Sequence, residues 1–582
     1  MRSTSRLAFL ATLSLFAPAL PLAAAPAAAL ELRVADVQKL LDDGRALLDK
    51  GDADGALKLF EQAAAAEKDS LRTRTWVVRA WLEQGRINDA RDAADELDRA
   101  HKGAPEVAYL YGFASLKSAE QKIASGRPDA TVGFDFQDAV ANLKEALASK
   151  RPEFKDGWLA LSRAAWNAQD HATALAAGEE AVKAYPKRAD AWRQLASAAL
   201  ASHIATAESD KAAAAKHVAR AIDACQTALS LTGEPKDAAG ERTRADIELA
   251  LGDALLWKGD AKAGGAAYAR ALALDPAIAD PGALWKRLGN EEFLSAITSA
   301  LDGFGKRHGA TDARAGTLAW WNGSACFSLG KHEDAEKAFA RALELAPNVL
   351  SSWYYLARVR TSRGDGMAAA EALRKFKEAN QAELMNWLAY EAFAKDNQAM
   401  LAWISGNCFR KAETLRTEGK LIESMPCIEA ALVVSEIRAA WTPEDPEAWS
   451  NIGLFTRDQG DVTNLLRRQK KDLPDPKPLW ERAFAAYEKS LALDDTNPNT
   501  LNDAAVILHY NLRRDFPKAR AMYQKAIARA EEQLAKPDLD PAVRKQLTEE
   551  LIVWANDNLK KLDADEKKAA EKPADADGDA GQ

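Results

Sequence analysis

A motif of small, aromatic and proline residues returns along this chain at a constant spacing. In the segments 252–276 and 323–347, Gly, Gly, an aromatic residue, Ala and Pro occupy the same offsets. Gly51 and Gly85 are 34 residues apart, and so are Trp353 and Trp387. Self-similarity at a fixed period indicates a repeat protein, in which each unit packs on its neighbours and no single core is needed.

The recurring residues are those that a hairpin of two helices requires. Glycine at the end of the first helix adopts a left-handed turn at the least steric cost, and a small residue inside that helix lets the second helix approach closely. The glycines predicted to end first helices are Gly51, Gly85, Gly259, Gly330, Gly364, Gly419 and Gly460. The glycines predicted at close helix contacts are Gly44, Gly112, Gly252, Gly323 and Gly453.

With this spacing and these residues, the chain resembles the tetratricopeptide repeat family, whose unit is a 34-residue pair of antiparallel helices. The resemblance implies an all-α fold, an α-solenoid of about ten to twelve helical hairpins between Val37 and Ala530. In this family the first helices line a concave surface on which ligands dock. The Lys/Asn clamp with which some members bind chaperone tails is not matched, because Leu41, Arg45 and Trp76 stand at corresponding positions.

Departures from the pattern divide the chain into predicted segments. Residues 1–29 form an export signal, 30–278 an N-terminal array with insertions at 126–133 and 205–216, 279–310 an irregular or degenerate repeat, 311–564 a C-terminal array with a capping helix at 541–562, and 565–582 a tail. The composition of the tail, rich in Ala, Asp, Lys and Glu, cannot bury a core and predicts disorder. Residues 462–478 are predicted to form a basic loop that ends near prolines.

The first residues have the composition of a secretory signal. Arg2 and Arg6 precede an apolar stretch, residues 7–22, and Ala27–Ala29 supplies the small residues of a cleavage site. We expect cleavage near Ala29 and a mature protein in the periplasm or outside the cell. An uncleaved anchor is the alternative, although two prolines interrupt the apolar stretch before it is long enough to span a bilayer.

No pattern of a catalytic, cofactor or metal site occurs in the sequence. It contains no Walker A motif, no H-E-x-x-H and no G-x-S-x-G, and its seven histidines are scattered. The net charge of −8 argues against nucleic-acid binding, which requires an excess of Lys and Arg. We therefore expect no enzyme, no metal or other cofactor, no nucleic-acid partner and no membrane span after removal of the signal.

The four cysteines are too few for a disulfide scaffold. Cys408 and Cys427 fall in the first and second helices of one predicted hairpin, so a disulfide between them is one interpretation. Two buried thiols that behave as small apolar side chains are the other.

Aromatic residues and arginines recur at positions that face the concave surface the resemblance implies. Trp320 and Tyr354 are one repeat apart, and we expect an aromatic row with an arginine beside it. Tyr, Trp and Arg dominate the energetics of protein interfaces. Packing between repeats is the alternative for several of these aromatic residues. The candidate partner-binding residues are Trp320, Phe327, Tyr354, Arg358, Arg79, Tyr109, Arg163 and Arg193.

Two functions from different classes follow. The first is a non-catalytic scaffold or adaptor in the cell envelope that binds a peptide segment or a folded partner on its concave surface. The second is a glycan-binding platform whose aromatic row stacks against sugar rings. A peptide ligand would depend on many positions along the groove, whereas a glycan would depend chiefly on Trp320 and Tyr354. An enzyme is a distant third.

Overall fold

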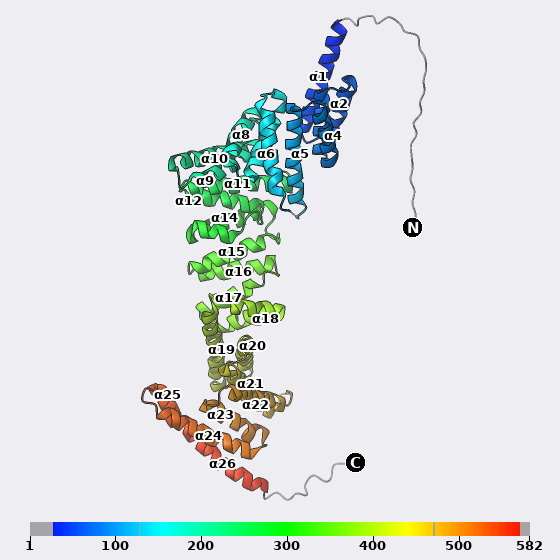
Figure 1. Cartoon of the computed structure of the whole chain (residues 1–582). Coiled ribbons are helices and arrows are strands. Elements are labelled where there is room, and N and C mark those ends of the chain that lie inside the picture. Colours follow the sequence, from blue (N-terminus) through cyan, green and yellow to red (C-terminus); the bar gives the residue numbers. More distant parts are fainter. Residues whose placement is uncertain (1–26, 127–128, 470–471, 571–582) are drawn as a thin grey trace, which may run out of the picture. The chain divides into compact units, whose positions relative to one another are not determined.

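Every regular element of the protein is helical in the residues that the structure describes, 27–126, 129–469 and 472–570 (Figure 1). The structure is a computed structural model. It confirms the all-α class and the hairpin repeat. Residues 1–26, which hold most of the predicted export signal, lie outside the described residues. No helix within the described ranges combines the length and the apolar character needed to cross a membrane.

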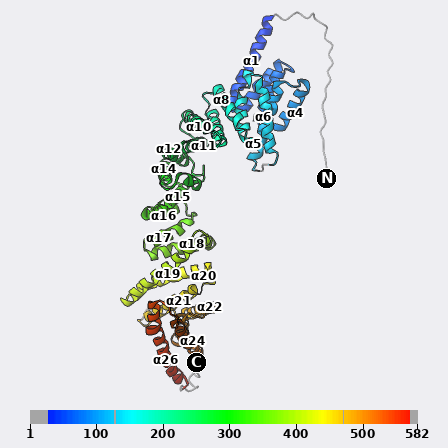
Figure 2. The same cartoon turned by 60° about the vertical axis from the view of Figure 1, so that its left-hand side comes forward.

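The chain forms two compact units. Unit 1 comprises the residues up to Lys236 together with Asp253–Asp260, and unit 2 comprises Asp237–Gly252 together with the residues from Ala261 onward. The division falls inside one helix, α11 (Ala238–Trp257), whereas the sequence pattern suggested a change at 279–310. Within each unit, consecutive hairpins lie side by side in chain order (Figures 1 and 2).

Among its described residues, unit 1 contains five helical hairpins and one short 3-10 helix. Its helices are α1 (Ala27–Asp49), α2 (Ala53–Ala66), α3 (Leu71–Glu83), α4 (Ile87–Ala100), α5 (Pro105–Ala124), α6 (Val132–Ala148), η1 (Pro152–Phe154), α7 (Asp156–Asn167), α8 (His171–Ala184), α9 (Ala189–Thr206) and α10 (Lys211–Thr232). The helices of the third and fifth hairpins, which flank the two predicted insertions, are longer than those of the second hairpin, α3 and α4.

Unit 2 continues the series of hairpins and ends in a terminal helix. After α11 its helices are α12 (Ala261–Leu274), α13 (Pro281–Leu288), α14 (Asn290–His308), α15 (Ala315–Ser328), α16 (His332–Leu345), α17 (Ser351–Ser362), α18 (Gly366–Ala389), α19 (Ala394–Thr417), α20 (Leu421–Trp441), α21 (Pro446–Arg468), α22 (Lys477–Leu493), α23 (Pro498–Val506), η2 (Ile507–Leu512), α24 (Phe516–Leu534), α25 (Pro541–Gln546), η3 (Leu547–Leu551) and α26 (Ile552–Ala570).

The turn inside each regular hairpin depends on a left-handed residue. The predicted turn glycines have φ between 70° and 90°, a conformation in which a side chain would be strained. A Cβ atom added there would meet no neighbouring atom, so the backbone conformation, and not a lack of space, selects glycine. These residues are Gly51, Gly85, Gly259, Gly330, Gly364 and Gly419.

A second set of glycines brings the two helices of a hairpin together. A Cβ atom on Gly323 in α15 would lie 2.8 Å from Cδ1 of the Phe339 ring in α16, closer than two carbon atoms can approach. The same relation joins Gly453 in α21 to Tyr487 in α22. The prediction of a close helix contact is confirmed for all five glycines: Gly44, Gly112, Gly252, Gly323 and Gly453.

Two expectations about α21 are wrong. Gly460 does not end a first helix but lies inside α21, against the indole of Trp480. The predicted loop at 462–478 is helical as far as Arg468. Val462 and Leu466 are four residues apart and both buried, so their apolar face holds this segment against the core and extends the helix.

The C-terminal cap is longer than the sequence suggested. Residues 541–570 form α25, η3 and α26, so the first six residues of the predicted tail are helical. Arg520 of α24 forms ion pairs of 2.6 Å with Asp563 and with Glu566, and these contacts fix the last turns of α26. The rest of the predicted tail lies outside the described residues.

The close contact at Gly323 predicts a specific cost. Gly323→Ala should destabilise the protein by about 1–3 kcal/mol because Phe339 has to move. Gly406→Ala is the matched control in unit 2: it also lies in a helix, but its added Cβ would be 3.5 Å from Arg410, so it should be neutral or slightly stabilising. Urea unfolding of both variants measures the difference; equal stabilities would contradict the role given to Gly323.

Candidate functional site

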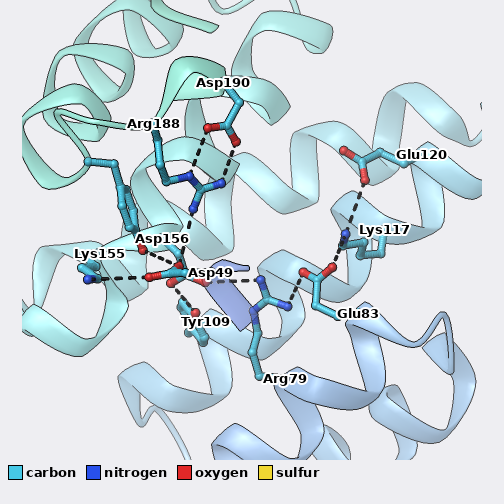
Figure 3. A network of polar contacts seen from close by, with 11 residues as sticks. Asp49, Arg79, Glu83, Tyr109, Lys117, Glu120, Lys155, Asp156, Arg188 and Asp190 are labelled. Atoms are coloured by element: carbon cyan, nitrogen blue, oxygen red, sulfur yellow. Dashed lines mark hydrogen bonds and ion pairs between the residues drawn. The ribbon is translucent and has the colours of Figure 1, made fainter. Parts of the chain in front are cut away.

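The first helices of unit 1 line a groove on one face of the hairpins. Its walls come from α1, α3, α5 and α7, together with Arg188 at the start of α9. Charged side chains dominate the groove, and many of them contact one another across successive hairpins (Figure 3). We name as the polar network the residues Asp49, Arg79, Glu83, Tyr109, Lys117, Glu120, Lys155, Asp156, Arg163, Tyr185, Arg188 and Asp190.

Arg79 lies at the centre of the polar network. Its guanidinium contacts Glu83 at 2.6 Å and Asp156 of α7 at 3.3 Å, and it lies 3.6 Å from the centroid of the Phe113 ring. The hydroxyl of Tyr109 donates a hydrogen bond of 2.6 Å to the other oxygen of Asp156. Three consecutive first helices are therefore joined through one buried arginine.

The network continues along both directions of the groove. Lys117 of α5 donates to Glu83 at 2.8 Å, and Arg163 of α7 contacts Glu120 at 3.0 Å. At the other end, Asp49 of α1 accepts a hydrogen bond of 3.0 Å from the hydroxyl of Tyr185 and lies 3.5 Å from Arg188.

Asp49 connects residues that are far apart in the sequence. Tyr185 and Arg188 follow Asp49 by 136 and 139 residues. Lys155, the residue before α7, lies 3.8 Å from the second carboxylate oxygen of Asp49. The end of α1 thus touches the beginning of α7 and of α9, so the first helices curve around a common groove.

Electrostatics fixes the charge states of this network. Burial by itself would raise the pKa of Glu83, but the positive charges of Arg79 and Lys117 lower it to about 2. Burial lowers the pKa of Arg79, and the acidic groups around it more than reverse that change. Burial and the charge of Asp156 raise the pKa of Tyr109 well above its usual value. At neutral pH the groove therefore carries fixed ion pairs and a neutral phenol.

A larger cavity adjoins the network and shares Asp49 and Lys155 with it. This α1 pocket has a volume of about 670 Å³ and lies between α1, α3 and the segment 152–155. Leu41 and Trp76 form its apolar floor, and both are almost fully buried. The charged residues that line it are Asp42, Arg45, Asp49, Arg72, Glu153 and Lys155.

The structure places two predicted site residues in the lining of this groove and a third beneath it. Arg79 and Arg163 line it, whereas Tyr109 is fully buried beneath it and cannot contact a partner, because its hydroxyl is bound to Asp156. Arg193 is half-buried in α9 and does not line either cavity. The acidic residues were not singled out from the sequence. A signal was present, since Asp49, Glu83 and Lys117 follow one another at the 34-residue period.

The aromatic row predicted for unit 2 does not present its rings to a ligand. Tyr354 is fully buried and cannot present its ring to a ligand. Its hydroxyl donates a hydrogen bond of 2.7 Å to Asn397 of α19 and accepts one of 2.9 Å from Arg358. Asn397 in turn donates to the carbonyl of Leu388 at 3.0 Å. Tyr354 and Arg358 therefore hold α19 against the end of α18.

The other members of the row pack between repeats. Trp320 and Phe327 are half-buried, and both contact Tyr355, at ring-centroid distances of 5.6 and 6.2 Å. Tyr355 also stacks on Phe339 at 5.1 Å. Packing, the alternative considered for several of these aromatic residues, describes this cluster better than an open ladder does.

The cysteines do not form the disulfide that the sequence allowed. Cys408 in α19 and Cys427 in α20 do belong to the two helices of one hairpin, but both are free and buried. Burial and the neighbouring Cys427 raise the pKa of Cys408 to about 12, so its thiolate is scarce at neutral pH. No cluster of three or more metal-ligating side chains occurs in the part of the chain that the structure describes.

Models of the tetratricopeptide repeat match residues 47–112, 135–189 and 310–383. Two of these segments contain hairpins of the groove just described. The chain is a tetratricopeptide-repeat protein. Tetratricopeptide repeats generally mediate contacts between proteins and are typically not catalytic. No curated protein matches the chain.

Several solved structures resemble this tetratricopeptide-repeat protein. A thermophilic tetratricopeptide-repeat protein of Thermus thermophilus is 18% identical, over 43% of this chain and 98% of the other, with a TM-score of 0.24. The MamA protein is 16% identical over 39% and 96%, with a TM-score of 0.23. The apo form of RapI is 12% identical over 69% and 97%, with a TM-score of 0.33. Scores this low say nothing about how the repeats are arranged or what they bind.

The polar network predicts a stability that depends on pH. Glu83→Gln should destabilise unit 1 by about 2 kcal/mol at pH 7, because the depressed pKa of Glu83 stabilises the folded state. This contribution is present above the ordinary carboxyl pKa and is lost as the pH falls from about 5 toward 2. The difference between variant and wild type should therefore shrink at pH 4 and further at pH 3.

Urea unfolding at pH 7, 4 and 3, with unit 1 followed by hydrogen exchange and mass spectrometry, measures this dependence. Glu96→Gln is the control in the same unit, because the Glu96 side chain is 61% exposed and its pair with Arg74 is a surface contact worth at most about 1 kcal/mol. A difference for Glu83→Gln that does not change with pH would contradict the assignment.

Proposed function

We propose that this tetratricopeptide-repeat protein is a non-catalytic adaptor of the cell envelope, and that the groove of unit 1 binds an extended segment of a partner protein. The observation that carries the proposal is the α1 pocket and the polar network beside it, which form one lined surface across four first helices. Such a surface offers contacts along a stretch of chain instead of a single reaction centre.

The lining of the groove suits a polypeptide. Peptide groups need both donors and acceptors, and the α1 pocket supplies carboxylates, guanidiniums and an amide above an apolar floor of Leu41 and Trp76. The charges of its walls are mixed, three acidic and three basic residues, so a segment with both kinds of charge is the best match.

The order of the groove lowers the cost of binding. Arg79, Glu83 and Asp156 are already held by one another, so these side chains lose little conformational freedom when a ligand arrives. More exposed groups remain available for direct contacts. Lys155 and Arg163 keep nearly half of their side-chain surface accessible although each has an acidic neighbour.

The location in the envelope rests on the sequence of residues 1–29 and is part of the proposal. A buried position of all four thiols is compatible with an oxidising compartment, because buried thiols are protected from reaction. The glycan alternative loses its main support, since the burial of Tyr354 removes one of the two rings on which it depended.

Site-specific photo-cross-linking tests the proposed groove. A photoreactive phenylalanine replaces Gln38 or Ala46 in the α1 pocket, or the exposed Lys58 of α2 as the control on a second helix. In an extract of the native envelope, we expect the Gln38 and Ala46 positions to capture the same short stretch of one partner. The Lys58 position should capture this partner at least about tenfold less.

The variant Lys155→Glu adds a check on charge. It should weaken capture through the Gln38 position by several-fold, since it removes one of the few accessible cations of the pocket. Equal capture from Lys58, or cross-links scattered over the partner surface, would contradict binding of an extended segment in this groove.

A further inference from the structure

Four aromatic side chains surround a hollow in unit 2 that the proposed function does not use. The rings of Tyr355, Trp387, Tyr390 and Phe393 line it, and its volume is about 460 Å³. Tyr355 and Trp387 form one pair, with ring centroids 5.7 Å apart, and Tyr390 and Phe393 form the other, at 5.6 Å. The polar side chains of the lining are Glu383 and Asn386.

A break in α18 creates this hollow. Asn380 leaves the helical conformation, and its side-chain oxygen accepts a hydrogen bond of 3.1 Å from the backbone N–H of Glu383. Asn380 thus caps a short second helix that ends at Ala389, and the turn that follows carries Tyr390 and Phe393. Tyr390 is 57% exposed, so its ring is open to solvent at the edge of the hollow.

The charge at the rim is negative. Asn380 donates a hydrogen bond of 3.3 Å to the carboxylate of Glu383 and so orients it, and within the described ranges Glu383 forms no ion pair with a basic residue. A cation, Arg358, packs on one of the four rings, with its guanidinium 4.6 Å from the centroid of Phe393. Arg358 donates to the hydroxyl of Tyr354 and is not part of the lining.

We propose that this hollow binds a quaternary ammonium group, the trimethylammonium head of a small organic cation. The faces of Trp and Tyr rings carry the negative part of the ring quadrupole and attract cations, most strongly where water is displaced. Glu383 adds a full negative charge at the rim. Aromatic rings and one carboxylate are the components that such a group needs.

The lining selects this cation over the basic side chains of a protein. A guanidinium carries five N–H donors and an ammonium three, and both lose energy when these donors enter an apolar site without acceptors. The side-chain acceptors of the lining are Glu383, Asn386 and the hydroxyls of Tyr355 and Tyr390, fewer than the donors of a guanidinium. A trimethylammonium group has no hydrogen-bond donor and an apolar surface, so its desolvation on entering the hollow costs the least free energy.

Calorimetric titration of the full-length protein with choline tests the proposal. The neutral compound 3,3-dimethylbutan-1-ol has the same shape without the charge and should bind about tenfold more weakly or not at all. Glu383→Gln and Tyr390→Leu should each weaken choline binding about tenfold. Because Tyr390 is largely exposed, its replacement should leave the helical content unchanged in circular dichroism.

Trp554→Leu is the matched control, because Trp554 is 54% exposed and does not line the hollow. It should bind choline as the wild type does. Cosedimentation with phosphatidylcholine vesicles, absent with phosphatidylglycerol vesicles, would assign the group to a lipid head, and choline binding without cosedimentation would assign it to a free small molecule. Absence of choline binding, equal binding of the neutral compound, or unchanged binding in both hollow variants would overturn the proposal.

Discussion

The close approach of the two helices in each hairpin is the contact on which the rest of the structure depends. At Gly44, Gly323 and Gly453 a ring of the second helix occupies the space that a side chain would fill. The contact fixes both the distance between the helices and their rotation about their axes. Once that rotation is fixed in each hairpin of unit 1, the same face of its successive first helices turns toward the groove, and positions 34 residues apart become neighbours.

This geometry explains why ionisable groups meet in unit 1. Asp49, Glu83 and Lys117 occupy equivalent positions of three consecutive first helices, and Lys117 reaches Glu83 at 2.8 Å. Buried charges are costly unless each finds a partner, and here Asp49, Glu83 and Asp156 each contact a basic residue. The network therefore both joins the repeats and keeps an ordered, polar groove that a partner can enter without rearranging it.

The sequence predicted the parts of this structure that repeat. The helical class, the turn glycines and the tight glycines followed from steric rules that act within one hairpin. The placement of Arg79 and Arg163 at the groove followed from the resemblance to the repeat family, whose first helices line the concave surface. The sequence did not predict the contacts that depend on a departure from the 34-residue repeat. Tyr354 has the spacing of a surface residue, but the break at Asn380 brings Asn397 over its hydroxyl and buries it. Asp49 meets Tyr185 and Arg188 because several hairpins curve together, and no local pattern contains that curvature.

Hydrogen exchange of the full chain tests the central claim most directly. The exchange would be compared with and without a synthetic peptide that carries the partner segment captured by the groove. The account predicts slower exchange in α1, α3, α5 and α7, whose side chains line the groove, and unchanged exchange in α2, α4, α6 and α8. Slower exchange confined to the second helices, or none in unit 1 while the peptide is bound, would contradict it.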